Sequence, residues 1–213
     1  MAFDNIISVY IYGSHVYGTA ENGSDYDFIA IVRDKHDLRL NSEVIKIAKE
    51  NLGIEMKKSI QADVHAYTEE EFLTALSNME ISFLECVNLR VHGVSNANST
   101  LIYGKNYEMP KIDLPKLRES ISKKSSNSWV KAKKKLQPLS PDYAPKIGKK
   151  SAWHALRILA FGCQLAEHGK INVECMNHIY DSIMQCGEWA DIDMQFRQTY
   201  NHLSTEFRKV APK

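Results

Sequence analysis

The chain has 213 residues, of which 44% are hydrophobic and 25% charged, a composition typical of a globular protein with one large or two small domains. No apolar stretch is long enough to span a bilayer, and the first residues lack the basic segment of a signal peptide. The four cysteines form no Cys-x-x-Cys pair, which fits reduced thiols. We therefore expect a cytoplasmic location and no membrane partner.

The formal net charge of +1 conceals an uneven distribution of charge. Residues 111–150 contain twelve basic and three acidic residues, a charge of +9, which leaves −8 for the rest of the chain. A basic segment of this kind is typical of a solvated helix face, but it also concentrates polyanions such as nucleic acid or triphosphate. The sequence leaves both interpretations open.

Strands and helices alternate in the first half of the predicted structure. Apolar, β-branched runs predict three strands and a later edge strand, at 5–12, 27–32, 59–67 and 101–104. A short helix is expected after residue 13, further helices at 41–53 and 68–76, and another short helix at 80–89. Thr68 and Glu71 form a capping box, so a helix should follow the third strand at once.

From residue 113 onward the pattern becomes helical. Four helices are predicted, at 113–136, 149–168, 173–185 and 191–208. The pattern therefore predicts an N-terminal half of alternating strands and helices, followed by an all-helical C-terminal half. We place the boundary so that the first domain covers 1–110 and the second, partly basic domain covers 111–213.

Two aspartates, one residue apart, open the second strand in the stretch "YGSHVYGTAENGSDYDFIAIV" (12–32). Alternate residues of a strand point to the same face, so Asp25 and Asp27 should project together from one edge of the sheet. Two close carboxylates repel each other unless a cation lies between them, and Mg²⁺, or Mn²⁺ in its place, is commonly held by carboxylates and substrate phosphates together. Asp63, in the third strand, is positioned to add a third carboxylate, an arrangement that suits two-metal displacement at phosphorus.

Gly13 and Ser14 directly follow the first strand. Glycine allows a phosphate to approach backbone N–H groups, a helix N-terminus favours an anion, and the Ser14 hydroxyl donates a further hydrogen bond. Together with the aspartates, this pair predicts a bound triphosphate and phosphoryl transfer. Taken piece by piece, the pattern is loose, because "GSDYD" also fits a polar turn that enters an ordinary strand.

This conjunction of residues resembles the DNA polymerase β-type nucleotidyltransferase superfamily, whose signature is a hydrophobic residue, Gly-Gly or Gly-Ser, about ten residues, and Asp-hydrophobic-Asp. Within it, "YGSHVYGTAENGSDYD" is similar to the bacterial and phage RNA-repair-associated branch, which carries G-S-x-x-x-G-x-x-x-x-x-S-D-x-D. The likeness extends to "DVHAYTEEEFLTALSNMEISFLECV" and "KKSAWHALRILAFG". It implies the fold class α+β, with a small mixed β-sheet and flanking helices followed by an all-helical C-terminal half. It also implies a catalytic domain over 1–110, Mg²⁺ held by Asp25, Asp27 and Asp63, and an NTP donor. It does not settle the acceptor.

A basic stripe marks the second predicted helix of the C-terminal half, through Lys150, His154, Arg157 and Phe161. The rest of this helix is mostly apolar, so the stripe should face a cleft, and buried Lys and Arg need anions. Lys150 and Arg157 are therefore nucleotide-binding candidates in a substrate- and nucleotide-binding domain over 111–213. Alternatively, Arg157 pairs with an internal carboxylate such as Glu85. For His154 a structural role is favoured over a functional one.

The run "WVKAKKK" (129–135) interleaves aromatic and basic residues, which indicates an RNA contact through four lysines: Lys131, Lys133, Lys134 and Lys135. The predicted function is metal-dependent transfer of NMP from an NTP to a hydroxyl, foremost on a tRNA or an RNA 3′ end, with release of pyrophosphate. Two alternatives remain: nucleotidylation of a protein, as by a toxin or regulator, and a non-catalytic nucleotide sensor or antitoxin. The base of the NTP and the oligomeric state are not predicted.

Overall fold

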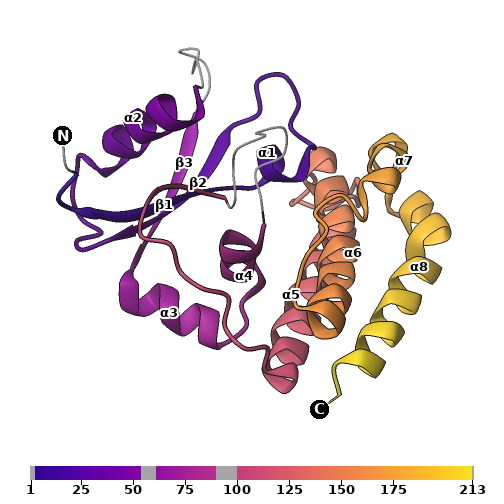
Figure 1. The fold of residues 1–213 in the computed structure, drawn as a ribbon. Coiled ribbons are helices and arrows are strands. Elements are labelled where there is room, and N and C mark those ends of the chain that lie inside the picture. Colours follow the sequence, from indigo (N-terminus) through magenta and orange to yellow (C-terminus); the bar gives the residue numbers. More distant parts are fainter. Residues whose placement is uncertain (1–2, 54–60, 90–99, 213) are drawn as a thin grey trace. The chain divides into compact units, whose positions relative to one another are not determined.

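The computed structural model of the protein describes residues 3–53, 61–89 and 100–212 (Figure 1). It divides into two compact units, Met1–Lys111 and Ile112–Lys213, and each is described by itself. In the described part of the chain, no helix is both long enough and apolar enough to cross a membrane.

The first unit is built on a four-stranded sheet of order β3-β2-β1-β4. Its strands are β1 (Ile6–Tyr12), β2 (Tyr26–Val32), β3 (Ala62–Thr68) and β4 (Leu101–Gly104). β1 pairs antiparallel with β2 and β4, whereas β2 and β3 are parallel. None of the residues 28–32 is more than 3% exposed, because β2 is a central strand whose two faces are both covered. The prediction of a small mixed sheet is confirmed.

Among the described residues of this unit, four helices accompany the sheet: α1 (Ser14–Tyr17), α2 (Leu40–Leu52), α3 (Glu69–Ser77) and α4 (Ile81–Asn88). α2 lies on one face of the sheet, and α3 and α4 lie on the other (Figure 1). The predicted capping box is confirmed, since the Glu71 N–H donates to Thr68 Oγ1 and the Thr68 N–H donates to a Glu71 carboxylate oxygen. The box starts α3 directly after β3 and turns the chain back under the sheet.

Aromatic rings join the α3–α4 layer to the sheet. Tyr10 of β1 stacks on Phe72 of α3 with ring centroids 5.8 Å apart, and Phe72 meets Phe83 of α4 edge to face at 5.5 Å. All three side chains are buried. This layer supports β1 and β2, whose connecting segment 13–25 carries the predicted glycine, serine and first aspartate.

The second unit is helical: α5 (Leu114–Lys135), α6 (Pro145–His168), the 3₁₀ helix η1 (Asn177–Ile179), α7 (Tyr180–Gln185) and α8 (Trp189–Val210). α6 is its central helix and packs against α5 and α8. At Gly162 of α6 an added Cβ would lie 2.8 Å from Ile121 of α5 and 2.9 Å from Phe207 of α8. The small residue therefore lets three helices approach closely.

The helix predicted at 173–185 begins later in the structure. Residues 173–176 form turns, and helical structure starts with η1 at Asn177. There the Asn172 N–H donates to Gln164 Oε1, the Glu174 N–H donates to Asn172 Oδ1, and Trp153 Nε1 donates to the Met176 carbonyl. Local bonds between side chains and backbone compete with helix formation. The prediction of an α+β fold with a helical second half is otherwise confirmed.

Candidate active site

The strand register places two of the three predicted carboxylates side by side. Asp27 of β2 is the direct partner of Asp63 of β3 in the parallel pair. Neighbouring strands lie about 4.8 Å apart, and directly paired residues project from the same face of a sheet. Asp25 lies just before β2, two residues from Asp27. The three aspartates therefore lie at the start of two adjacent parallel strands.

The electrostatics of Asp27 reflect this crowding. Burial raises the pKa of the Asp27 carboxyl above its ordinary value, and the neighbouring Asp63 and, more weakly, Asp25 raise it further. His65 and His15 act in the opposite direction. A bound cation would remove the repulsion between the carboxylates.

Gly13 lies directly against the Asp27 carboxylate. It has φ +80°, and a Cβ added to it would lie 2.0 Å from Asp27 Oδ2. Any side chain at this position would both strain the backbone and displace the carboxylate. Gly13 is also the residue before α1, and its carbonyl accepts from the N–H groups of Val16 and Tyr17. Gly13 thus lies next to Asp27, and Ser14 follows it as the first residue of α1.

The segment between Gly13 and Asp27 is fixed by three contacts of α1. The His15 ring stacks on the Tyr26 ring with centroids 3.8 Å apart, and His15 Nε2 donates to the Ser24 carbonyl at 3.3 Å. The Tyr17 hydroxyl donates to Glu85 Oε2 of α4 at 2.5 Å. Tyr17 is buried, so this ring belongs to the core.

The donor set at this edge fits a hard divalent cation, since it consists of carboxylate oxygens with the exposed Asp25 and Asp63 free to reorient toward an ion. Among the described residues, no three His, Cys, Asp or Glu side chains already converge as a metal-holding group. The carboxylates are neighbours but do not form a complete set of metal ligands. Their assignment as metal ligands stays a prediction.

Sequence reasoning missed the two histidines beside this site. His65 lies two residues after Asp63 in β3, is exposed, and therefore projects from the same face. The strand period applied to Asp25 and Asp27 would have found it. The position of His15 directly after Ser14 could have indicated that it lies near the site. Its contacts with Ser24 and Tyr26 could not be predicted, because they depend on the path of the loop.

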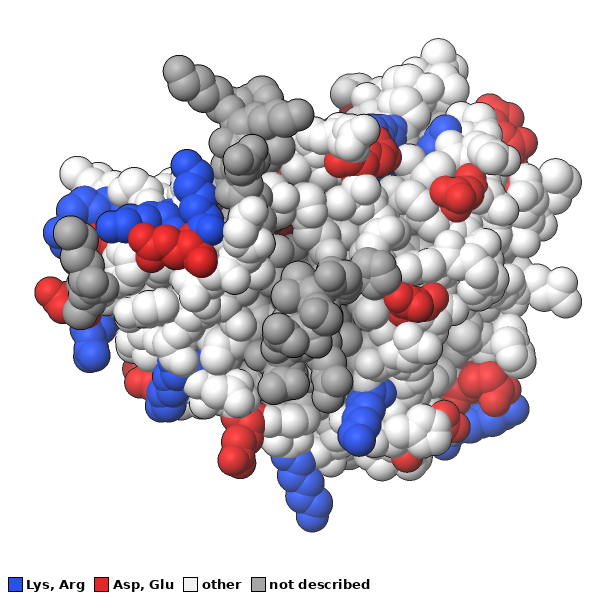
Figure 2. All heavy atoms as spheres, turned by 45° about the horizontal axis from the view of Figure 1, so that its top comes forward, with Lys and Arg blue, Asp and Glu red and all other residues white. Residues whose placement is uncertain are grey.

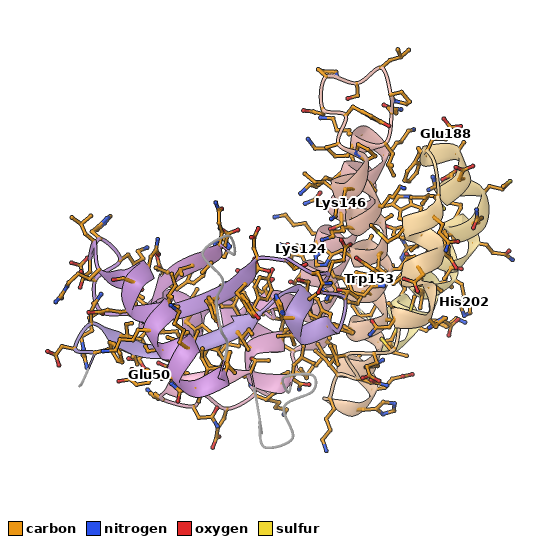
Figure 3. All side chains as sticks on the ribbon, turned by 90° about the horizontal axis from the view of Figure 1, so that it is seen from above. Glu50, Lys124, Lys146, Trp153, Glu188 and His202 are labelled. Carbon is orange, nitrogen blue, oxygen red and sulfur yellow. The ribbon has the colours of Figure 1, made fainter. Side chains whose placement is uncertain are left out.

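In the second unit, Arg157 of α6 is fully buried. One of its Nη atoms donates to His154 Nδ1 at 2.8 Å, and its guanidinium lies 4.9 Å from the Trp153 ring centroid and 5.2 Å from that of Phe161. Burial, then the Arg157 charge, holds the pKa of His154 well below its ordinary value, so His154 is a neutral acceptor. This supports the structural role favoured for it. Trp153, labelled in Figure 3, is likewise buried.

Lys150 is half-buried on α6, and the assignment of Lys150 and Arg157 to a nucleotide stays a prediction. In α5, Lys131 and Lys133 are exposed, whereas Lys134 and Lys135 lie 3.6 and 3.9 Å from Asp142.

Trp129, the aromatic residue of the same run, has a structural explanation. It is 5% exposed and stacks on Tyr200 of α8 with ring centroids 4.4 Å apart. It is therefore a core residue and unsuited to stacking a base. On the face drawn in Figure 2, the described basic and acidic side chains are interspersed, with no broad basic area.

Comparison with known proteins agrees with this geometry. Residues 1–83 match the family model described as polymerase beta, nucleotidyltransferase. This part of the chain is therefore similar to the polymerase β-type nucleotidyltransferases that the sequence pattern resembles. The prediction of the RNA-repair-associated branch within this superfamily stays a prediction.

Among solved structures, the chain is similar to spectinomycin adenyltransferase AAD(9) from Enterococcus faecialis, crystallised with ATP and spectinomycin. The identity is 15% and the TM-score 0.46, over 97% of this chain and 93% of that one. A likeness at this level says nothing about the acceptor or the roles of residues. A search of curated proteins gave no significant match.

Proposed function

We propose that this protein transfers NMP from a nucleoside triphosphate to a hydroxyl acceptor, with Asp25, Asp27 and Asp63 holding Mg²⁺ or Mn²⁺. The observation that carries the proposal is the direct pairing of Asp27 with Asp63 in parallel strands, beside a glycine that abuts the Asp27 carboxylate. Close, mutually repelling carboxylates oppose folding, so a ligand rather than the fold explains them. The match of residues 1–83 to a nucleotidyltransferase family supports the same reaction class.

In the proposed reaction, the acceptor oxygen bonds to the α-phosphorus of the NTP while the bond from that phosphorus to the α–β bridging oxygen breaks. Pyrophosphate leaves with the bonding electrons, and Asp63 takes the proton of the acceptor hydroxyl. Ser14 and neighbouring backbone N–H groups hold the departing phosphates. When bound, the divalent cations neutralise charge on the phosphates and align the reacting oxygens. The remaining contribution of the protein is the fixed placement of charges and dipoles.

The acceptor we propose is RNA, foremost a tRNA or another RNA 3′ end. The support is the charge of +9 over residues 111–150, together with the exposure of Lys131 and Lys133. An excess of exposed lysine attracts a phosphate backbone and makes its binding depend on salt. Protein and small hydroxyl compounds are the competing acceptors.

The test is a screen of the four α-³²P-labelled NTPs with total RNA and with RNA-free lysate, in Mg²⁺ and in Mn²⁺. Label on RNA, with equimolar release of pyrophosphate, is the expected result, and Asp63→Asn should abolish it. Label on polypeptide would move the acceptor to protein and keep the chemistry. Binding of NTP without any pyrophosphate release, across all acceptors, would establish a nucleotide sensor instead.

The RNA contact has its own test. The double variant Lys131→Gln/Lys133→Gln should bind RNA more weakly and lower the slope of log affinity against log salt by about 2, roughly 1 per lysine. Lys170→Gln, an exposed lysine beyond the end of α6, is the matched control and should leave the slope unchanged. Equal slopes in the double variant and the control would remove these lysines from the RNA interface. Filter binding between low and physiological salt measures the slopes.

A further inference from the structure

We propose that His15 is the positioning residue for Asp25, the carboxylate that lies outside the sheet. This inference rests on the proposed function, because it takes Asp25 as a metal ligand. It assigns His15 no contact with substrate or metal. Its role is to hold the backbone on both sides of Asp25.

The two contacts of His15 bracket Asp25 in the sequence. Nε2 donates to the carbonyl of Ser24, the residue before Asp25, at 3.3 Å. The imidazole ring stacks on Tyr26, the residue after it, with centroids 3.8 Å apart and an angle of 9° between the planes. One side chain therefore fixes the peptide that leads into Asp25 and the ring that follows it.

Asp25 depends on this support more than the other two carboxylates do. Asp27 and Asp63 lie within paired strands, where the ladder fixes their backbone. Asp25 precedes β2, is exposed, and follows a turn with Gly23 at φ +86° and a bond from the Ser24 N–H to the Glu21 carbonyl. A ligand on such a segment has its orientation set by side-chain contacts rather than by a strand ladder.

His15 also links the two halves of the proposed site. It is adjacent to Ser14, the predicted phosphate-binding residue, on the same four-residue helix. That helix is fastened to α4 through the hydrogen bond from the Tyr17 hydroxyl to Glu85 and abuts Asp27 through Gly13. The helix that presents Ser14 thus also holds Asp25, so phosphate and metal ligands keep a fixed separation.

The experiment measures Mn²⁺ binding directly, from the loss of the free Mn²⁺ signal in electron paramagnetic resonance, at constant protein concentration without nucleotide. His15→Ala removes both contacts and should raise the Mn²⁺ dissociation constant about tenfold, and His15→Phe, which keeps a stacking ring, should raise it by about threefold. His36→Ala, an exposed histidine of the same unit, is the control and should bind Mn²⁺ as the wild type does. Thermal unfolding of each variant is recorded in parallel.

The readouts separate the possible failures. If His15 only stabilises the fold, His15→Ala lowers Tm while the folded protein binds Mn²⁺ with unchanged affinity, which would overturn the inference and leave the proposed function standing. If the wild type itself binds no Mn²⁺, the metal assignment and the inference fall together. A graded loss of affinity from Phe to Ala supports the inference.

Discussion

The carboxylate edge of the first unit and the basic stripe on α6 of the second unit differ in what surrounds their charges. At the carboxylate edge, Asp27 has like-charged neighbours and a raised pKa. On α6, the fully buried Arg157 donates to His154 and lies over the rings of Trp153 and Phe161. Spacing along the sequence singled out both groups. Burial and the neighbouring carboxylates disfavour the charged form of Asp27, whereas Arg157 has a hydrogen bond and ring contacts within its unit, so the functional argument is stronger for the carboxylates.

The largest effect is expected from a substitution at the carboxylate edge. Asp27→Asn should lower NMP transfer at least about 100-fold, the scale expected when a preorganised transition-state charge is lost. The same change should not destabilise the metal-free protein. Because the pKa of Asp27 is raised in the folded state, its contribution to stability is full at low pH and is lost as pH rises through the folded-state value. Label transfer and metal-free thermal unfolding at neutral pH measure the two effects.

The control for Asp27→Asn is Glu50→Gln, which removes an exposed carboxylate of α2 in the same unit (Figure 3). It should change neither transfer nor Tm. A marked fall in Tm for Asp27→Asn would show that the fold uses this carboxylate, and the contrast between the two regions would disappear.

The next effect tests the stripe on α6. Arg157→Ala should destabilise the protein by about 3 kcal/mol, because it removes a large buried side chain together with its hydrogen bond to His154 and its ring contacts. Arg208→Ala, an exposed arginine of α8, should cost less than about 0.5 kcal/mol. Urea unfolding compares the two. If the two variants were equally stable, Arg157 would contribute nothing to the fold. That result would favour the interpretation that the stripe binds a nucleotide.

A smaller effect concerns the stability of the protein at low pH. The pKa of His154 lies well below its ordinary value of 6.5, because of burial and then the charges of Arg157, Lys124 and Lys131. The unfolded state therefore binds the proton first, so this contribution to stability is full above pH 6.5 and declines as pH falls below it, by at most about 1.4 kcal/mol per pH unit. His154→Gln keeps an acceptor for Arg157 and should flatten the decline. Parallel slopes of urea midpoint against pH would contradict the assignment.

The smallest effect is chemical and concerns Cys163 of α6. Burial, assisted by Glu167, raises the pKa of this thiol to about 11. At neutral pH its thiolate fraction is then about 100-fold below that of an ordinary cysteine, so iodoacetamide should label it correspondingly slowly in the folded protein. Peptide mass spectrometry against a urea-unfolded sample gives the ratio. Equal labelling would show that α6 is not packed as described.

Much of the first unit was predictable because strand period and caps are local signals. The strands, the Thr68–Glu71 box and the placement of the third strand beside the second are confirmed. The contacts of His15 were not predictable, since a ring stack across an irregular loop depends on the path of that loop. The burial of Trp129 was missed for a related reason: its partner Tyr200 lies 71 residues away on α8, beyond the reach of any local pattern.

The pairing of Asp27 with Asp63 also bears on how the protein assembles. Parallel strands require a crossover connection, and here 36 positions, including α2, separate the two aspartates. The two carboxylates become neighbours only after this long connection has closed. The entropic cost of that closure comes before the contacts between the strands can stabilise the fold. A chain that ends before residue 63 therefore lacks one of the two carboxylates that we propose as ion ligands. We therefore expect divalent cations to bind this unit only after β2 and β3 have paired, so that their binding indicates completed folding.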